Sequence, residues 1–387
     1  MDLGFSKALR VTPLVSHPVK CVPAADPWAW TKRALSINAN EPMTNLTPSA
    51  ARRPIGQTDL MVTELGFGGA PLGNLYCEVS DGDANTAVEA AWDIGMRYFD
   101  TAPLYGFGMS ERRIGDMIRK RAREDYVLST KVGRLLRRFP GHKGSVGRHG
   151  YCSSMPFDLQ YDYSYDGVMR SYEDSLQRLG LASIDILLVH DIGELTHGQD
   201  NDDHFAHLTQ SGYKALEELR SSGAIKAIGL GVNEWHVCEA AMEIGRWDCF
   251  LLAGRYTLLE QGGMATFMPK CRAHGASLIL GAVYNSGILA TGARTGGTLR
   301  YNYAPARNNI VERVLAIEAV CEAHSVTLAA AALQFPLANP LVSSVIPGLN
   351  CESQARQTCD LFRENIPAAF WFDLKSSGLL AAEAPTP

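Results

Sequence analysis

The sequence predicts an α/β fold and, within that class, a single-domain (β/α)8 barrel (TIM barrel) with extended loops at its C-terminal face. From about Gly56 onward, short apolar segments alternate with amphipathic segments. Continuous apolar strands that alternate with helices indicate a parallel sheet covered on both faces. Eight such units over about 300 residues are typical of a closed barrel. A doubly wound sheet is the alternative, but it needs a GxGxxG turn with an acid further on, and “GFGGAPLG” is not followed by that pattern.

The eight predicted strands lie near residues 64, 97, 126, 183, 225, 248, 277 and 341. Helices are predicted at 84–95, 110–120, 166–180, 212–223, 234–245, 262–275, 308–325, 327–338 and 351–362. The first of these ends at Gly95, a typical helix stop, and the second opens on Ser110 as its N-cap. In the helix at 166–180, the spacing of Val168, Tyr172 and Leu179 gives one apolar stripe.

The chain divides into three predicted parts. Residues 1–50 form an N-terminal extension that we expect to be disordered or targeting-like, because it is poor in acids and contains closely spaced prolines. Residues 51–375 form the barrel, and residues 376–387 form a flexible C-terminal tail. Arginine is sparse in the extension, so mitochondrial targeting is the weaker alternative to a cytoplasmic location.

Composition excludes several classes of function. The net charge of −5 and the pI near 6.1 give no sign of a nucleic-acid-binding surface. No apolar run reaches the roughly 18 residues that a membrane span needs. The nine cysteines are scattered without CxxC or metal-ligand spacing, which is typical of reduced thiols in a cytosolic protein. The pattern does not decide between a monomer and a homodimer.

Polar side chains stand at the ends of successive predicted strands, where the active sites of (β/α)8 barrels form. Asp100 ends the second strand and Tyr105 lies in the Gly-rich loop after it. Lys131 ends the third strand, and His190 and Asp191 end the fourth. Each residue alone has an ordinary structural explanation, such as a packed tyrosine or a turn acid. Their joint presence at one end of adjacent strands indicates a catalytic site.

These residue types suit proton transfer coupled to hydride transfer. The phenol of Tyr105 has an ordinary pKa of about 10, and a nearby ammonium lowers such a pKa by favouring the phenolate. We expect Asp100 to hold Lys131 charged and in place, and His190 to hydrogen-bond a substrate oxygen. Tyr105 would then act as general acid in carbonyl reduction, or as general base in alcohol oxidation, while a cofactor carries the hydride.

From about residue 53 to residue 363 the chain resembles the aldo-keto reductase superfamily. The matching segments are “FDTAPLYGFGMSERRIG”, “STKVGR”, “DILLVHD”, “GLGVNEW”, “RYTLLEQ” and “VIPGLNCESQARQ”. The resemblance implies a (β/α)8 barrel that binds a nicotinamide dinucleotide across its C-terminal face. It also implies that the catalytic tetrad is Asp100, Tyr105, Lys131 and His190, with Tyr105 as the acid/base.

The resemblance implies a set of cofactor-binding positions as well. Gly69 and Ala70 would lie near the nicotinamide, and Asn233 would hold its carboxamide. Tyr284 would stack on the nicotinamide ring, with a packing role as the alternative. The usual Ser and Gln of the family are replaced here by Val232 and Ala253.

At the adenine end, the implied contacts are Gly348, Gln354 and Gln357. NADPH-dependent members carry Lys and Arg at the first two of these positions, where they pair with the 2′-phosphate. Because charge-assisted contacts are the strong ones, the loss of both cations favours NAD over NADP. Arg356 is close by and could compensate, so NADP stays open.

Within the superfamily, “GFGGAPLGNLY”, “VHDIGE”, “LLAGRYTLLEQ” and “VYNSGIL” resemble the D-threo-aldose 1-dehydrogenase group, which includes L-fucose and L-galactose dehydrogenases. The implied reaction oxidises the anomeric hydroxyl of an L-fucose, L-galactose or D-arabinose type of aldose to a lactone with NAD(P). One alternative is pyridoxal 4-dehydrogenase activity, which converts a hemiacetal to pyridoxolactone. The others are an NADPH-dependent aldehyde or ketone reductase and a non-catalytic partner subunit that senses the dinucleotide.

Predicted substrate contacts lie near the mouth of the site. They are Tyr76, Asp191 and Asn285, together with loops at 134–165 and 192–210. The second loop contains three histidines, but their spacing fits no common metal site, so we expect a solvated loop and no metal. The substrate would be a small molecule, either a sugar or a pyridoxal-like compound.

Overall fold

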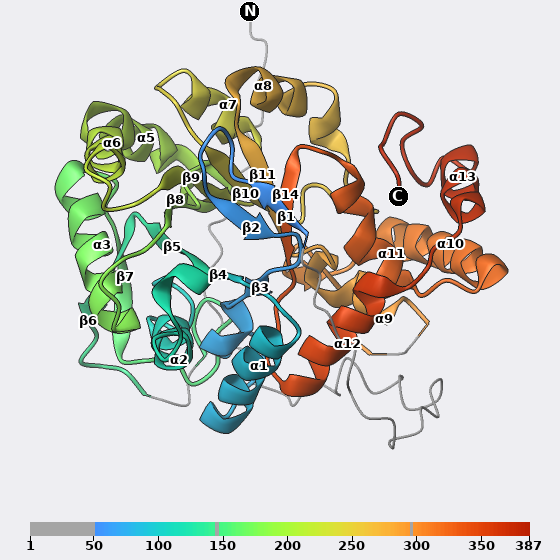
Figure 1. Ribbon diagram of the computed structural model, residues 1–387, viewed down its shortest axis with the longest axis horizontal. Coiled ribbons are helices and arrows are strands. Elements are labelled where there is room, and N and C mark those ends of the chain that lie inside the picture. The colour runs from blue at the N-terminus through green and yellow to red at the C-terminus, as the bar shows by residue number, and fades with distance from the viewer. Residues whose placement is uncertain (1–50, 144–146, 295–296) are drawn as a thin grey trace, which may run out of the picture.

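The computed structural model describes residues 51–143, 147–294 and 297–387. Eight parallel strands form one sheet in the order β14-β11-β10-β9-β8-β5-β4-β3. The two outer strands meet, because Gly66 N donates to Val345 O and Gly68 N donates to Pro347 O, both at 2.9 Å. The predicted (β/α)8 barrel is therefore confirmed, with helices surrounding the strands (Figure 1).

All eight predicted strands are present. They are β3 (Phe67–Gly68), β4 (Tyr98–Asp100), β5 (Val127–Val132), β8 (Ile186–His190), β9 (Ala227–Val232), β10 (Cys249–Ala253), β11 (Ser277–Gly281) and β14 (Val342–Ile346). The helices are α1 (Asp81–Asp93), α2 (Met109–Ile118), α3 (Tyr165–Leu179), α4 (Glu194–His197), α5 (Asn201–His207), α6 (Tyr213–Ser221), α7 (His236–Met242), α8 (Phe267–His274), α9 (Ile288–Thr291), α10 (Asn308–His324), α11 (Leu328–Gln334), α12 (Glu352–Arg363) and α13 (Ala368–Ser376). Three antiparallel pairs lie outside the barrel: β1 (Arg52–Pro54) with β2 (Met61–Thr63), β6 (Arg134–Arg138) with β7 (Phe157–Tyr161), and β12 (Arg300–Tyr301) with β13 (Ala304–Pro305).

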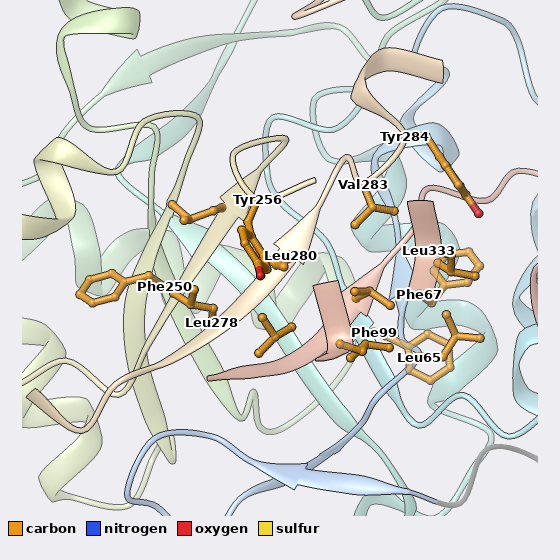
Figure 2. Packing of buried hydrophobic residues seen from close by; sticks show 14 of the residues in the cluster. Leu65, Phe67, Phe99, Phe250, Tyr256, Leu278, Leu280, Val283, Tyr284 and Leu333 are labelled. Atoms are coloured by element: carbon orange, nitrogen blue, oxygen red, sulfur yellow. The ribbon is translucent and has the colours of Figure 1, made fainter. Parts of the chain in front are cut away.

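Side-chain alternation along the strands separates two apolar layers. In β8, Ile186 and Leu188 belong to the cluster inside the barrel, whereas Leu187 and Val189 belong to the layer between the strands and the helices. Figure 2 shows part of this outer layer, including Phe99 of β4. The members of the inner cluster are Ile55, Leu60, Val62, Tyr98, Val127, Ile186, Leu188, Ala227, Cys249, Leu251, Ile279 and Ile346.

The same alternation explains why three strand-end side chains point inward. Asp100 is two residues after the inward Tyr98, and His190 is two residues after the inward Leu188. Lys131 is four residues after the inward Val127. With a side-chain period of two, all three belong to the interior face, at its carboxyl end.

The amino end of the barrel is closed by the β1–β2 hairpin, which lies across the strands in Figure 1. Gly56 N donates to Ser277 Oγ at 3.0 Å, and Ser343 Oγ donates to Pro54 O at 2.6 Å. Ile55 and Val62 of this hairpin are fully buried in the inner cluster. The open end of the barrel is therefore the one that carries the polar strand ends.

The structure differs from the sequence expectations in the connecting segments. The loop expected at 134–165 contains the β6–β7 hairpin, and the loop expected at 192–210 is largely helical, in α4 and α5. Ser110 is not an N-cap: α2 starts at Met109 after Gly108, and the buried Ser110 hydroxyl donates to Gly69 O at 2.7 Å. Helix α13 was not expected.

The predictions for the two terminal segments have different outcomes. The N-terminal extension expected at residues 1–50 lies outside the described residues. The segment expected to be a flexible tail, 376–387, packs against the rest of the chain, since Leu380 and Ala384 are buried and Leu379 O accepts a hydrogen bond from Arg313.

Across the described residues, no single helix is long and apolar enough to cross a membrane. One pair of segments, Asn308–His324 with Leu328–Ala338, passes that test of length and composition only when taken together, and it is bent by 102°.

Candidate active site

A fully buried ion pair forms the floor of the site. Lys131 Nζ lies 2.6 Å from Asp100 Oδ2, with the two side chains 0% and 2% exposed. Lys131 Nζ also donates to Thr101 O at 2.9 Å, and Ser129 Oγ donates to Asp100 Oδ1 at 2.7 Å. A buried charge pair of this kind is tolerated only when its remaining polar atoms are satisfied, as they are here. We refer to Asp100 and Lys131 as the floor pair.

The position of the ammonium depends on a glycine in β9, two strands away from β5 in the sheet. A Cβ on Gly231 of β9 would lie 3.1 Å from Lys131 Cε, which is tighter than ordinary van der Waals contact. The absence of a side chain at Gly231 therefore leaves room for the Lys131 stem across the barrel interior.

Tyr105 is held over the floor pair by the loop that follows β4. Its backbone N donates to Ala102 O at 3.1 Å, and its backbone O accepts from Ser110 N at 3.1 Å. Gly106 has φ +66°, and a Cβ on it would lie 2.6 Å from Gly73 O, so two loop backbones touch here only because the residue is glycine. Lys131 Nζ lies 4.8 Å from the centre of the Tyr105 ring.

The pKa of Tyr105 shifts in the direction opposite to the one expected. Burial raises the pKa of this phenol well above its ordinary value, and the nearby Asp100 raises it further. The expectation that Lys131 lowers this pKa is wrong, because the charge of Lys131 is already matched by Asp100 at 2.6 Å. At neutral pH, Tyr105 therefore carries its proton and is ready to act as an acid.

His190 completes the predicted tetrad. Its ring lies 5.8 Å from the Tyr105 ring, centre to centre, at 87°. Burial lowers the pKa of His190 well below its ordinary value, and the cations Arg134 and Lys131 lower it further. A neutral imidazole can donate one N–H to a substrate oxygen without adding a charge.

A second buried ion pair lies beside His190, at the rim of the site. Arg134 Nη2 lies 2.7 Å from Asp191 Oδ2, with side chains 6% and 14% exposed. The same carboxylate oxygen is 3.5 Å from His190 Nε2, and the other accepts from Asn233 Nδ2 at 3.1 Å. Asp191 adopts φ +45°, a strained conformation for a non-glycine residue. We refer to Arg134 and Asp191 as the rim pair.

Tyrosine side chains from several loops surround Tyr105. The Tyr151 ring lies 6.2 Å from the Tyr105 ring, and Tyr303 OH donates to Asn233 Oδ1 at 3.2 Å. The predicted substrate contact Tyr76 lies in the same region, with Arg300 Cζ 5.5 Å from its ring centre. Burial raises the pKa of Tyr76 to about 12.

Sequence reasoning missed Arg134, Tyr151, Tyr163 and Tyr303 as individual residues. Tyr163 OH donates to the backbone carbonyl of His190 at 2.9 Å and lies 2.8 Å from His197 Nε2. These four residues come from segments without strand periodicity. Of these four residues, only Arg134 had a usable sequence signal. It is separated from the predicted strand end “STKV” by a single glycine.

One predicted substrate residue, Asn285, has its amide hydrogen-bonded to protein groups. Asn285 is 2% exposed, accepts from Thr257 Oγ1 at 2.6 Å and donates to Gly254 O at 3.3 Å. Its amide therefore joins the loops after β10 and β11, and a contact with substrate stays a prediction.

The carboxyl end of the barrel fits a nicotinamide dinucleotide in part. Helix α12 begins after Cys351, whose side chain makes no cap hydrogen bond, and a free helix N-terminus suits a phosphate. Asn233, at the end of β9, could hold the carboxamide by exchanging its contact with Tyr303. Gln357 lies half-buried on α12. These residues and the α12 N-terminus are those that would hold the cofactor.

Other predicted cofactor positions have structural roles in this arrangement. Gln354 is buried and accepts a hydrogen bond from Asn350 N at 3.0 Å. Gly348 bridges to Gly68, where the barrel closes. Gly69 N donates to Asp100 O at 2.8 Å, and Ala70 begins the next short helix.

Tyr284 lies after β11 in the outer apolar layer, beside Val283 (Figure 2). Its ring is 8% exposed, and stacking on a nicotinamide stays a prediction.

The histidines expected in a solvated loop are partly packed. The His197 ring lies 4.6 Å from the Tyr161 ring and 4.1 Å from the His204 ring. His207 is exposed. In the described parts of the chain, no group of three or more His, Cys, Asp or Glu side chains could hold a metal ion.

Comparison with known proteins gives a consistent picture. The model of the Aldo/keto reductase family matches residues 64–377. The chain is 45% identical over 341 residues to pyridoxal 4-dehydrogenase of Microbacterium luteolum, which covers 86% of this chain and 99% of that protein. It is 37% identical over 349 residues to D-threo-aldose 1-dehydrogenase of a Pseudomonas species, covering 89% and 100%. An aldo-keto reductase of Bacillus halodurans in its holo form superposes with a TM-score of 0.64 at 23% identity, covering 86% of this chain and 97% of that one, and supports the fold.

Proposed function

The chain belongs to the Aldo/keto reductase family, and we propose that it oxidises a cyclic hemiacetal to a lactone with a nicotinamide dinucleotide as hydride acceptor. The observation that supports this most is the convergence of the floor pair, Tyr105 and His190 at the carboxyl end of the barrel. A phenol, an ammonium and a neutral imidazole around one point are the groups that proton transfer from a carbinol oxygen needs.

The proton steps follow from the geometry. The hemiacetal hydroxyl would donate its proton to Tyr105 in its phenolate form, while His190 donates a hydrogen bond to the same substrate oxygen. The hydride from the reacting carbon would pass to the cofactor, which supplies the two-electron acceptor. In the reverse direction, the protonated phenol would donate to a carbonyl oxygen. Because burial raises the pKa of Tyr105, the acid form dominates at neutral pH and oxidation would need a higher pH.

For the substrate, we propose pyridoxal in preference to the aldoses that the sequence resemblance favours. Both compounds form cyclic hemiacetals, so the same proton and hydride steps serve either one. The relative at 45% identity, over 99% of its length, is named for pyridoxal, and the relative named for D-threo-aldose is 37% identical.

For the cofactor, we propose NAD rather than NADP. Gly348 provides no cation, Gln354 is occupied by Asn350, and Arg356 is paired with Glu352 at 2.8 Å. A 2′-phosphate would therefore find few free charges near α12.

A panel of substrates and cofactors tests the proposal. Purified protein would be assayed with NAD and with NADP on pyridoxal, L-fucose, L-galactose and D-arabinose, with lactone formation followed by mass spectrometry. We expect lactone from pyridoxal, and a higher kcat/KM with NAD. If all four compounds are inert while NADPH reduces aldehydes, the protein is instead a carbonyl reductase.

The matched variants Tyr105→Phe and Tyr165→Phe test the mechanism. The first removes the acid/base hydroxyl, and we expect turnover to fall by about 10²–10⁴ while cofactor binding, measured by fluorescence titration, is unchanged. The second removes an exposed hydroxyl that donates only to Glu218, and turnover should stay at the level of the unaltered protein. Full activity of Tyr105→Phe would refute the assignment of Tyr105 as the acid/base. If the unaltered protein showed neither cofactor binding nor turnover, both the dehydrogenase and the reductase function would be contradicted.

A further inference from the structure

Arg134 is a buried cation beside the reacting centre that the proton steps do not use. It begins β6, three residues after Lys131, and its side chain is 6% exposed. Its Nη2 contacts the Asp191 oxygen that lies 3.5 Å from His190 Nε2. The guanidinium therefore stands next to the imidazole that would face the substrate oxygen.

Among the described residues, one donor of the Arg134 guanidinium has no acceptor. Its Nε is buried and has no hydrogen-bond partner among the described residues. Asp191 differs, because one carboxylate oxygen accepts from Arg134 and the other accepts from Asn233. A guanidinium has five N–H donors in a planar fork, so it can serve Asp191 and a second acceptor together. A buried donor left open in this way calls for an acceptor that the protein does not supply.

Aromatic side chains lie near the guanidinium of Arg134. The Tyr161 ring lies 5.4 Å from Arg134 Cζ, and the Tyr151 ring lies 6.2 Å from the ring of Tyr105. Tyr76 borders the same region with Arg300 over its ring. Rings of this kind pack best on the face of a planar ligand, by offset or edge-to-face contacts. Arg134 and Arg300 bring two cations to this region, and the carboxylate paired with Arg134 is Asp191, so the rim favours a ligand with negative charge.

Resting on the proposed function, we propose that Arg134 is a specificity-determining residue that binds an oxyanion on the ring carbon adjacent to the one bearing the hemiacetal. The substrate class is then an aromatic cyclic hemiacetal with a phenolate oxygen in the ortho position. Pyridoxal has this arrangement in its 3-oxygen, whereas L-fucose and related aldoses are neutral and not planar. Lys131, by contrast, is already paired with the carboxylate of Asp100 and also donates to Thr101 O.

The test compares two substrates in three proteins, the unaltered protein and two variants, at pH 8. The substrates are pyridoxal and 3-deoxypyridoxal, which lacks only the phenolic oxygen. The variants are Arg134→Lys, which keeps a positive charge for Asp191 but loses the fork, and the matched control Arg137→Lys. Arg137 lies on the same strand, is half-buried, and donates to Gln160.

For the unaltered protein, we expect KM for 3-deoxypyridoxal to exceed that for pyridoxal by about 10–100-fold, the ratio that loss of a charged hydrogen bond gives. Arg134→Lys should raise KM for pyridoxal by a similar factor, change KM for 3-deoxypyridoxal by less than about threefold, and leave kcat nearly unchanged. Arg137→Lys should behave as the unaltered protein with both substrates.

The outcomes separate the two proposals. Equal KM values for the two pyridine substrates in the unaltered protein would overturn the role of Arg134 without the use of any variant. An equal loss with both substrates in Arg134→Lys would mean that Arg134 only supports Asp191. Oxidation of aldoses but not of pyridoxal would overturn the role of Arg134 and leave hemiacetal oxidation standing. Failure of every hemiacetal with either cofactor would overturn the proposed function itself.

Discussion

The floor pair and the rim pair are both buried ion pairs, but they are supported in different ways. Asp100 and Lys131 come from neighbouring barrel strands, and strand register sets their separation. Arg134 begins a hairpin outside the barrel, and Asp191 follows the end of β8 in a strained conformation. All polar atoms described for the floor pair are satisfied, whereas the rim pair leaves Arg134 Nε open.

This difference separates chemistry from recognition. The barrel holds the groups that move protons in a geometry that loop changes do not alter, and the loops carry the groups that select a substrate. Changes at the floor should therefore affect folding and turnover together. Changes at the rim pair should affect KM more than they affect folding or kcat.

The largest effect is expected from Lys131→Met. This change leaves Asp100 buried without a counter-charge, so the free energy of unfolding should fall by about 3–5 kcal/mol, and turnover should be lost. Urea unfolding followed by circular dichroism measures the first quantity, and the hemiacetal assay measures the second.

The double variant Asp100→Asn with Lys131→Met sharpens this prediction. It removes both charges, so part of the lost stability should return while activity stays absent. Stability of the double variant equal to or below that of Lys131→Met would show that the cost does not come from the unpaired carboxylate.

The second prediction concerns the pH dependence of oxidation. Because burial and Asp100 raise the pKa of Tyr105 above its ordinary value, the phenolate fraction should rise about tenfold per pH unit across pH 7 to 9. The rate of hemiacetal oxidation, measured as kcat/KM at fixed cofactor, should rise with it. Carbonyl reduction uses the protonated phenol and should show no such rise, and an oxidation rate already constant at pH 7 would contradict the assigned pKa direction.

The floor was predictable from the sequence because barrel strands obey a strict rule. Apolar runs marked all eight strands, and the period of two placed Asp100, Lys131 and His190 on one interior face. The direction of the Tyr105 pKa was not predictable, because it depends on how completely Asp100 already neutralises Lys131.

The rim could not be predicted in the same way. Arg134 and Tyr151 reach the site through a hairpin whose pairing joins Arg134 to Tyr161, twenty-seven positions apart in the chain (161 − 134). Loop contacts of this range have no periodic signature in sequence. The same reason explains why the link that Asn285 makes between two loops was not predicted.

The third prediction concerns Tyr163, which links the segment after β7 to the end of β8. Its hydroxyl donates to His190 O at 2.9 Å from a fully buried position. Tyr163→Phe should lower the free energy of unfolding by about 1–2 kcal/mol, since the hydroxyl loses its hydrogen bonds to His190 O and His197 Nε2. Tyr165→Phe is the exposed control and should change it by less than about 0.5 kcal/mol. Equal values for both variants, by urea unfolding, would show that this link carries no stability.

The smallest effect is expected at His197, on the outer side of the rim. Burial, together with the neighbouring His204 and Arg134, lowers the pKa of His197 from 6.5 to about 4. The folded state therefore favours the neutral ring, so its contribution is fully present above pH 6.5 and is lost as the pH falls from 6.5 toward 4. The ring is only half-buried, so water screens part of this contribution.

The fall in Tm between pH 7 and pH 5 should be smaller in His197→Gln than in the unaltered protein. His207→Gln, at an exposed position, should keep the full fall, and the same slope in all three proteins would show that His197 does not titrate differently on folding.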